Sequence, residues 1–207
     1  MTRGTGGESY FHLALECARG RARCPGPSAS GGRARLLTGS GCSIVHMTVN
    51  EIKALLGLEP HPVEGGFYRR TYTSMGSIPL AHGVRALGTA IYYLLEPGTF
   101  SEMHMLASDE IFHFYLGDPV EMLQLAEDGS SDVFTLGPEL EAGHHVQLVV
   151  PAGVWQGTRL VEGGKLALLG CSVTPGFDFE DYRSGSCAEL VQKWPEQAER
   201  IRELTRR

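Results

Sequence analysis

Short apolar runs separated by turn residues constrain the fold of this chain more than any other feature of its sequence. The runs are rich in valine, isoleucine, leucine and aromatic residues, and Glu127-Asp128-Gly129 is a strong turn between two of them. They cover residues 66–73, 86–95, 111–116, 120–126, 146–150 and 165–173. Many short strands joined by tight turns predict an all-β antiparallel sandwich or barrel, and a jelly roll is one standard form.

Composition changes sharply near Met47. Residues 1–46 are rich in Gly, Arg, Ser and Ala, contain few acidic residues and show no amphipathic period. Such a segment buries too little apolar area to offset chain entropy, so we expect a disordered tail. A translation start at Met47, or a transit peptide, would explain the same composition. Residues 47–207 are then one domain, which suits the chain length of 207 residues.

Only the two ends of this domain have helical patterns. Asn50 is the expected N-cap of a short helix that carries Ile52, Leu55 and Leu56 on one face and stops at Gly57. Near the C-terminus an apolar stripe at helical spacing is interrupted by a proline. The stripe consists of Ala188, Leu190, Val191, Ala198, Ile201 and Leu204, with Pro195 as the interruption.

Charge and cysteine content exclude several classes of partner. The net charge is -6, and nucleic-acid binding needs a basic face, so we expect no nucleic-acid partner. No apolar run approaches the roughly 18 residues of a membrane span, so we expect no membrane partner. The five cysteines are scattered without a C-x-x-C pair, which indicates reduced thiols in a cytoplasmic protein.

The segment between Gly98 and Gly117 carries the clearest chemical signal. It resembles the first motif of the cupin superfamily, Gly-x5-His-x-His-x3-Glu-x6-Gly, with His104 and Glu110 in place and Leu106 at the second histidine. A histidine and a glutamate on barrel strands can face one cavity, because alternate side chains point inward.

A second segment, which begins at Gly143, resembles the other cupin motif, Gly-x5-Pro-x-Gly-x2-His-x3-Asn. The turn at Pro151 and Gly153 is intact, Gln156 stands where the last ligand histidine would be, and Leu160 replaces the asparagine. A metal site would consist of His104, Glu110 and Gln156, with Mn, Fe, Ni or Zn as the ion. Because an amide oxygen is a weak ligand for these ions, we favour loss of the metal and expect no definite cofactor.

Further segments resemble one branch of the cupins, made of small single-domain proteins related in fold to deoxysugar 3,5-epimerases. They are the stretches 61–69, 91–95, 108–114, 149–156 and 175–181, in the order of the family. In that branch an apolar residue also occupies the position of Leu106. The resemblance implies a jelly-roll barrel, a homodimer and a polar central pocket that binds a small molecule. It implies no established reaction.

Five further side chains are candidates for lining that pocket. Glu64 precedes two glycines, and Arg69 would grip a carboxylate or phosphate if it faced inward. Gln147 and Gln156 are polar residues within apolar stretches and could orient a ligand. His113 would need a bulge to face inward, since it lies three residues after Glu110. Each also has a simpler interpretation as a surface or turn residue.

Three classes of function stay open on these residues, and whether the protein is an enzyme is not decided. The first is a metal-free isomerase or epimerase, with His104 as base, Glu110 as its partner and a tyrosine, Tyr92 or Tyr93, as acid. The second is a metal-dependent cupin enzyme. The third is a ligand-binding protein without turnover, because a fold does not fix a function.

Overall fold

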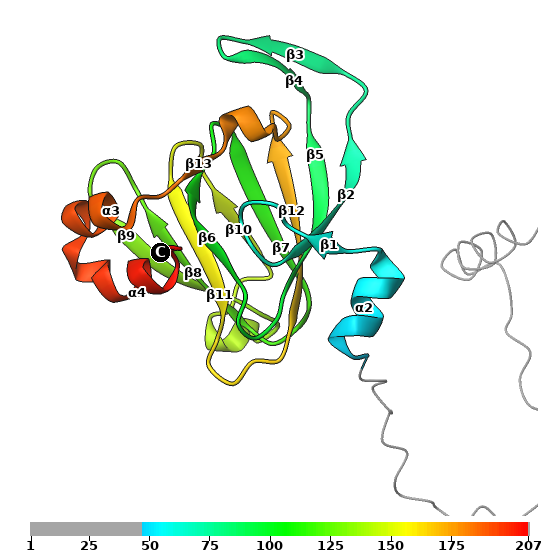
Figure 1. The fold of residues 1–207 in the computed structure, drawn as a ribbon, viewed down its shortest axis with the longest axis vertical. Coiled ribbons are helices and arrows are strands. Elements are labelled where there is room, and N and C mark those ends of the chain that lie inside the picture. The colour runs from blue at the N-terminus through cyan, green and yellow to red at the C-terminus, as the bar shows by residue number, and fades with distance from the viewer. Residues whose placement is uncertain (1–46, 207) are drawn as a thin grey trace, which may run out of the picture. The chain divides into compact units, whose positions relative to one another are not determined.

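The computed structural model describes residues 47–206, and these form two facing antiparallel sheets (Figure 1). Within this range the first sheet has six strands in the order β1-β2-β5-β12-β7-β10, and the second has five in the order β13-β6-β11-β8-β9. The first consists of β1 (Glu59–Pro60), β2 (Phe67–Thr73), β5 (Thr89–Leu95), β12 (Ala167–Thr174), β7 (Asp109–Gly117) and β10 (Gln147–Val150). The second consists of β13 (Arg183–Ser184), β6 (Phe100–Met105), β11 (Trp155–Leu160), β8 (Val120–Leu125) and β9 (Ser131–Leu136). This is the expected jelly-roll barrel.

A separate hairpin of β3 (Ser77–Leu80) and β4 (Gly83–Ala86) projects from the end of β2 and β5 (Figure 1). The sequence predicts every strand of the described residues except this hairpin and five others. The five are β1, β6, β9, β11 and β13. The missed β6 and β11 are rich in polar residues, and polar residues weaken the apolar pattern by which a strand is recognised.

Alternation of side chains builds the interior of the barrel. Inward-facing residues of both sheets form one apolar cluster. It contains Tyr93, Leu95, Phe112, Val120, Met122, Leu136, Leu148, Val150, Ala167, Leu169 and Cys171. The polar residues His104, Glu110, Gln156, Thr158 and Ser101 are also buried, and they form the part of the interior that apolar packing does not explain.

A bulge in β6 brings two of these polar residues onto one face. Across β6 and β11, Gln156 lies opposite His104 and Thr158 lies opposite Ser101. Between these pairs, two residues of β6 therefore lie opposite the single residue Gly157 of β11. Residues directly opposite one another share a face of the sheet. Ser101 and His104 therefore both point inward, although their spacing of three would separate them in a regular strand.

The first helix, α2 (Val49–Leu56), begins two residues earlier than expected. Its N-cap is Thr48, which forms a reciprocal capping box with Glu51, so the prediction of Asn50 was wrong. Gly57 ends the helix with a left-handed backbone, as expected. Ile52 packs with Leu94 and Leu168 on the outer face of the six-stranded sheet.

The C-terminal segment covers the outer face of the five-stranded sheet. Within it, α3 (Cys187–Lys193) and α4 (Ala198–Glu203) are separated by a 3-10 turn (Pro195–Gln197), as the proline predicts. Their apolar side chains, which include Trp194 and Leu204, pack against Met103 and two leucines of β8. Gly157 leaves the space that Leu204 fills, because a Cβ there would lie 3.3 Å from the Leu204 side chain.

Two further expectations concern a membrane span and the N-terminal tail. No helix among residues 47–206 is long and apolar enough to cross a membrane. The tail expected for residues 1–46, and with it the question of a start at Met47, lies outside the described residues.

The packing of the C-terminal segment predicts the effect of shortening the Leu204 side chain, which is 1% exposed. Leu204→Ala removes apolar contacts and leaves a cavity against β11, so we expect the free energy of unfolding to fall by about 2–5 kcal/mol in urea titrations. The matched control is Leu140→Ala, at a side chain that is 63% exposed. A change there of more than about 0.5 kcal/mol, or none at Leu204, would contradict this description of the core.

Candidate functional site

A pocket of about 400 Å³, including the part that opens to solvent, enters the barrel between the two sheets. The chemically active groups come from the loop before β2, from β6 and from β7. The lining residues are His61, Glu64, Tyr68, Arg70, Thr89, Ile91, His104, Leu106, Glu110, Cys171, Val173 and Phe177.

The tautomer of His104 is fixed by the backbone of its own strand. His104 Nδ1 lies 2.7 Å from the Glu102 carbonyl oxygen, which can only accept a hydrogen bond, so Nδ1 carries the proton. In the neutral ring Nε2 then keeps its lone pair. The imidazole is 1% exposed and stacks on Tyr182, with ring centroids 4.9 Å apart and planes at 16°.

Gln156 lies between the two residues of the first motif. Its amide nitrogen is 3.2 Å from His104 Nε2 and also donates a short hydrogen bond to Glu110 Oε2. The amide oxygen Oε1 is buried and has no hydrogen-bond partner among residues 47–206. A buried acceptor without a donor is costly, and Gln156 lies behind the lining residues His104 and Glu110.

Glu110 is a carboxyl group with perturbed acidity. Burial raises its pKa to about 7, the negative charge of Glu64 adds to this rise, and contacts with His104, Gln156 and Cys171 oppose it. Its Oε2 lies 4.0 Å from His104 Nε2. At neutral pH the group therefore exists in both protonation states, which suits a proton donor or acceptor.

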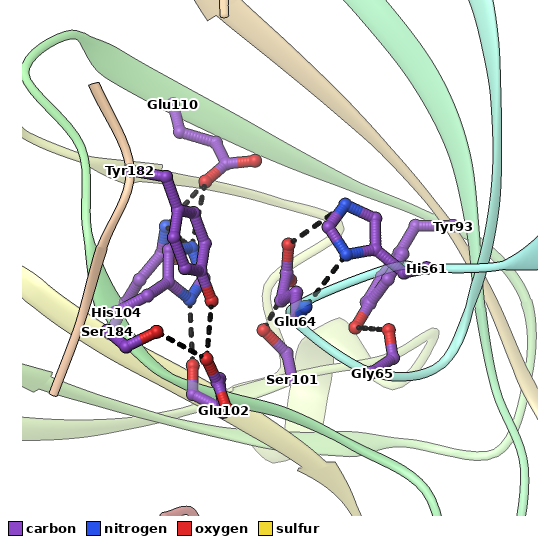
Figure 2. A network of polar contacts seen from close by, with 11 residues as sticks. His61, Glu64, Gly65, Tyr93, Ser101, Glu102, His104, Glu110, Tyr182 and Ser184 are labelled. Carbon is purple, nitrogen blue, oxygen red and sulfur yellow. Dashed lines mark hydrogen bonds and ion pairs between the residues drawn. The ribbon is translucent and has the colours of Figure 1, made fainter. Parts of the chain in front are cut away.

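Glu64 reaches the pocket from the loop between β1 and β2, together with His61 (Figure 2). The Ser101 hydroxyl donates to Glu64 Oε1, and the Glu64 backbone N–H donates to His61 Nδ1 at 2.8 Å. Gly65 has φ 103°, and a side chain there would collide with the Phe100 carbonyl, so glycine is needed for the loop to approach β6.

A second polar network is centred on Glu102, next to His104 (Figure 2). The Glu102 carboxylate accepts hydrogen bonds from the hydroxyls of Tyr182 at 3.0 Å and Ser184 at 2.8 Å. Arg206 completes it with an ion pair at 3.3 Å. The C-terminal segment thus holds Tyr182 against the His104 ring and fixes the strand whose carbonyl sets the tautomer.

Four of the predicted site residues lie elsewhere. Arg69, Tyr92, His113 and Gln147 form a row across the six-stranded sheet, since Arg69 pairs with Tyr92, both Tyr92 and His113 pair with Gly170, and His113 pairs with Gln147. Tyr92 packs with the outer cluster of α2, so the row lies on the outer face. The placement of these residues in the pocket was wrong, because their strands keep regular alternation at these positions.

Other residues occupy the places in and beside the pocket that were predicted for these four. Arg69 donates to the Leu56 carbonyl at the end of α2, at 2.7 Å, and its neighbour Arg70 lies at the pocket mouth instead. The candidates predicted from the sequence did not include His61, which lines the pocket, or Tyr182, which stacks on His104. His61 could have been found, because it lies in the same cupin-like segment as Glu64. Nothing in the sequence near Tyr182 indicates that it stacks on His104.

The residues do not fit a divalent metal centre. The amide N–H groups of Gln156 occupy the place between His104 Nε2 and Glu110 Oε2, where a shared cation would lie. Leu106 contributes an apolar side chain to the same pocket. Among residues 47–206 no group of three or more His, Cys, Asp or Glu side chains is arranged to hold a metal.

The acidity of Glu110 predicts a pH dependence of stability. Its pKa is raised from 4.5 to about 7 in the folded protein, so the protonated group contributes stability that is complete below about 4.5 and is lost as the pH rises through about 7. We expect the free energy of unfolding to fall across this window relative to Glu110→Gln. Denaturant titrations at several pH values measure it. An exposed control, Glu162→Gln, should keep the wild-type profile, and parallel profiles for wild type and Glu110→Gln would contradict the assignment.

Comparison with known proteins agrees with this fold. The family model described as cupin superfamily (DUF985) matches residues 50–184. The uncharacterized protein YML079W of Saccharomyces cerevisiae is 29% identical over an alignment of 133 residues. The match covers 58% of this chain and 66%, just under two thirds, of the yeast protein. A hypothetical protein from Leishmania major has a TM-score of 0.73 at 28% identity and covers 78% of this chain and 100% of its own.

Protein SO0799 from Shewanella oneidensis has a TM-score of 0.71 at 33% identity, over 77% of this chain and 98% of its own. The family match spans both cupin-like motifs and the loop that carries Glu64. The chain therefore belongs to the DUF985 family of the cupin superfamily.

Proposed function

We propose that this cupin binds a small organic molecule in the barrel pocket and acts on it as a metal-free isomerase or epimerase. One observation carries the proposal. The unprotonated Nε2 of His104 and the Glu110 carboxyl, whose pKa is about 7, lie 4.0 Å apart beside the pocket. A base and an acid held side by side at neutral pH are the groups that proton transfer at a carbon centre needs.

His104 acts as the base in this proposal. Its Nδ1 proton is held by the Glu102 carbonyl, so a proton from the ligand is taken at Nε2. In the structure, the Gln156 amide donates an N–H to Nε2. This N–H must move away from Nε2 when the ligand approaches. Its second contact, to Glu110, keeps the amide anchored during this shift.

Glu110 takes the role of acid that the sequence assigned to a tyrosine. Tyr92 lies on the outer face of the sheet, and the Tyr93 hydroxyl donates to the Gly65 carbonyl at 2.9 Å. Burial also raises the pKa of Tyr93 well above its usual value, so it is a poor proton donor. Glu110 lines the pocket, and its protonated form can return a proton to the ligand.

Deuterium exchange tests this proposal across a panel of candidate substrates. We expect the protein in D2O to exchange a carbon-bound proton in at least one member of a panel of amino acids, keto acids and sugars. His104→Asn should slow the exchange by about 100-fold or more. His113→Asn, a histidine on the outer face, is the matched control and should exchange at the wild-type rate. Equal rates in His104→Asn and wild type would contradict the mechanism.

A chelation experiment separates this proposal from a metal-dependent enzyme that uses His104, Glu110 and Gln156. We expect exchange to persist after dialysis against EDTA, and elemental analysis to find Mn, Fe, Ni and Zn well below one equivalent per chain. Stoichiometric metal, with activity lost on chelation and restored by the ion, would support the metal-dependent alternative. Ligand binding without exchange in any condition would support a protein that binds without turnover.

A further inference from the structure

Among residues 47–206, the pocket lining holds two carboxyl groups and no buried lysine or arginine to match them. Glu64 and Glu110 face it from different sides, Glu64 from the loop before β2 and Glu110 from β7 (Figure 2). We propose that the ligand carries a protonated primary amine, which lies between these two carboxyl groups. This names the ligand class of the pocket in the proposed function and rests on that pocket being the binding site.

The charge balance of the lining residues is the first argument. Of the cationic side chains near the pocket, Arg206 is paired with Glu102, and Arg70 lies at the mouth, exposed and 5.6 Å from the Phe177 ring. Within residues 47–206, neither arginine forms a hydrogen bond or an ion pair with Glu64 or Glu110. Buried carboxylates are normally paired, so a cationic group from the ligand would supply the missing charge.

His61 cannot supply that charge. Its Nδ1 accepts the Glu64 backbone N–H at 2.8 Å, so this nitrogen is unprotonated. Burial lowers the pKa of His61, and His104 and Arg206 add to this shift, while the charge of Glu64 opposes it without reversing it. The neutral ring carries its proton on Nε2, 3.8 Å from Glu64 Oε2, too far for a direct hydrogen bond.

The unpartnered oxygen of Gln156 is a second, independent argument. Gln156 is 1% exposed and contacts both His104 and Glu110, and both of these line the pocket. Its Oε1 accepts no hydrogen bond from residues 47–206. An ammonium group offers three donors and no acceptor, which suits two carboxyl groups that line the pocket and, one contact deeper, an amide oxygen without a donor.

The remaining wall suits the apolar part of an amine. Tyr68, Phe177 and Ile91 line the pocket, and His61 packs edge-on against Tyr68 with ring centroids 4.6 Å apart. Aromatic faces attract cations as well as apolar groups. A carboxylate or phosphate in the same place would meet Glu64 and Glu110, and like charges in a buried site repel strongly.

A matched set of probes tests the proposal by binding alone. Benzylamine, benzyl alcohol and benzoate share one ring and differ in the charge of the attached group. We expect benzylamine to bind at least about tenfold more tightly than the other two in NMR titrations, because charge-assisted hydrogen bonds are the stronger ones. EDTA is present throughout, so that a trapped metal cannot mediate the contact.

Variants connect the binding to the pocket. Glu64→Gln should weaken the binding of benzylamine by about tenfold or more and leave the affinity for benzyl alcohol unchanged. The exposed control Glu162→Gln should leave both affinities unchanged. Equal affinity of amine and alcohol, tighter binding of benzoate, or no loss in a folded Glu64→Gln would overturn the proposal. His104→Asn distinguishes the two proposals, since it should slow exchange by about 100-fold or more and retain benzylamine binding. Exchange at the wild-type rate in this variant would count only against the proposed reaction.

Discussion

The pairing of β6 with β11 is the constraint on which the rest of the site depends. It places Gln156 opposite His104 and, through a bulge, Thr158 opposite Ser101. Without the extra residue in β6, either Ser101 or His104 would face the C-terminal helices, as Met103 does. The bulge thus lets one short strand hold both His104 and the hydroxyl that binds Glu64 inside the barrel.

The polar interior has a cost that the surrounding structure offsets. His104, Gln156 and Glu110 are almost fully buried, and each is held by a backbone or side-chain partner. Behind them, Glu102 is satisfied by Tyr182, Ser184 and Arg206. The Oε1 of Gln156 and the hydroxyl of Thr158 have no such partner among residues 47–206. Unsatisfied polar atoms of this kind are expected where a fold is shaped for a ligand rather than for stability alone.

Apolar runs and turn residues predict six of the eleven strands in the two sheets, and with them the fold class. Glycine and proline signals predict the end of α2 at Gly57 and the break at Pro195. Motif spacing finds His104, Glu110, Gln156 and Glu64 as residues that come together. It fails for Tyr92, Arg69, His113 and Gln147, because which face a strand turns inward depends on its partners across the sheet. Tyr182 could not be found from sequence, since its contact with His104 depends on the long-range pairing of β13 with β6.

The state of the His104 ring tests the central claim most directly, because the proposed base exists only if Nε2 is unprotonated. A long-range proton–nitrogen correlation spectrum of the labelled protein reports both ring nitrogens, and His104→Asn identifies the signal. The Glu102 carbonyl predicts that the neutral ring carries its proton on Nδ1 and leaves Nε2 unprotonated. A ring protonated on Nε2 alone would contradict the hydrogen bond to Glu102 and, with it, the role of His104 as the base.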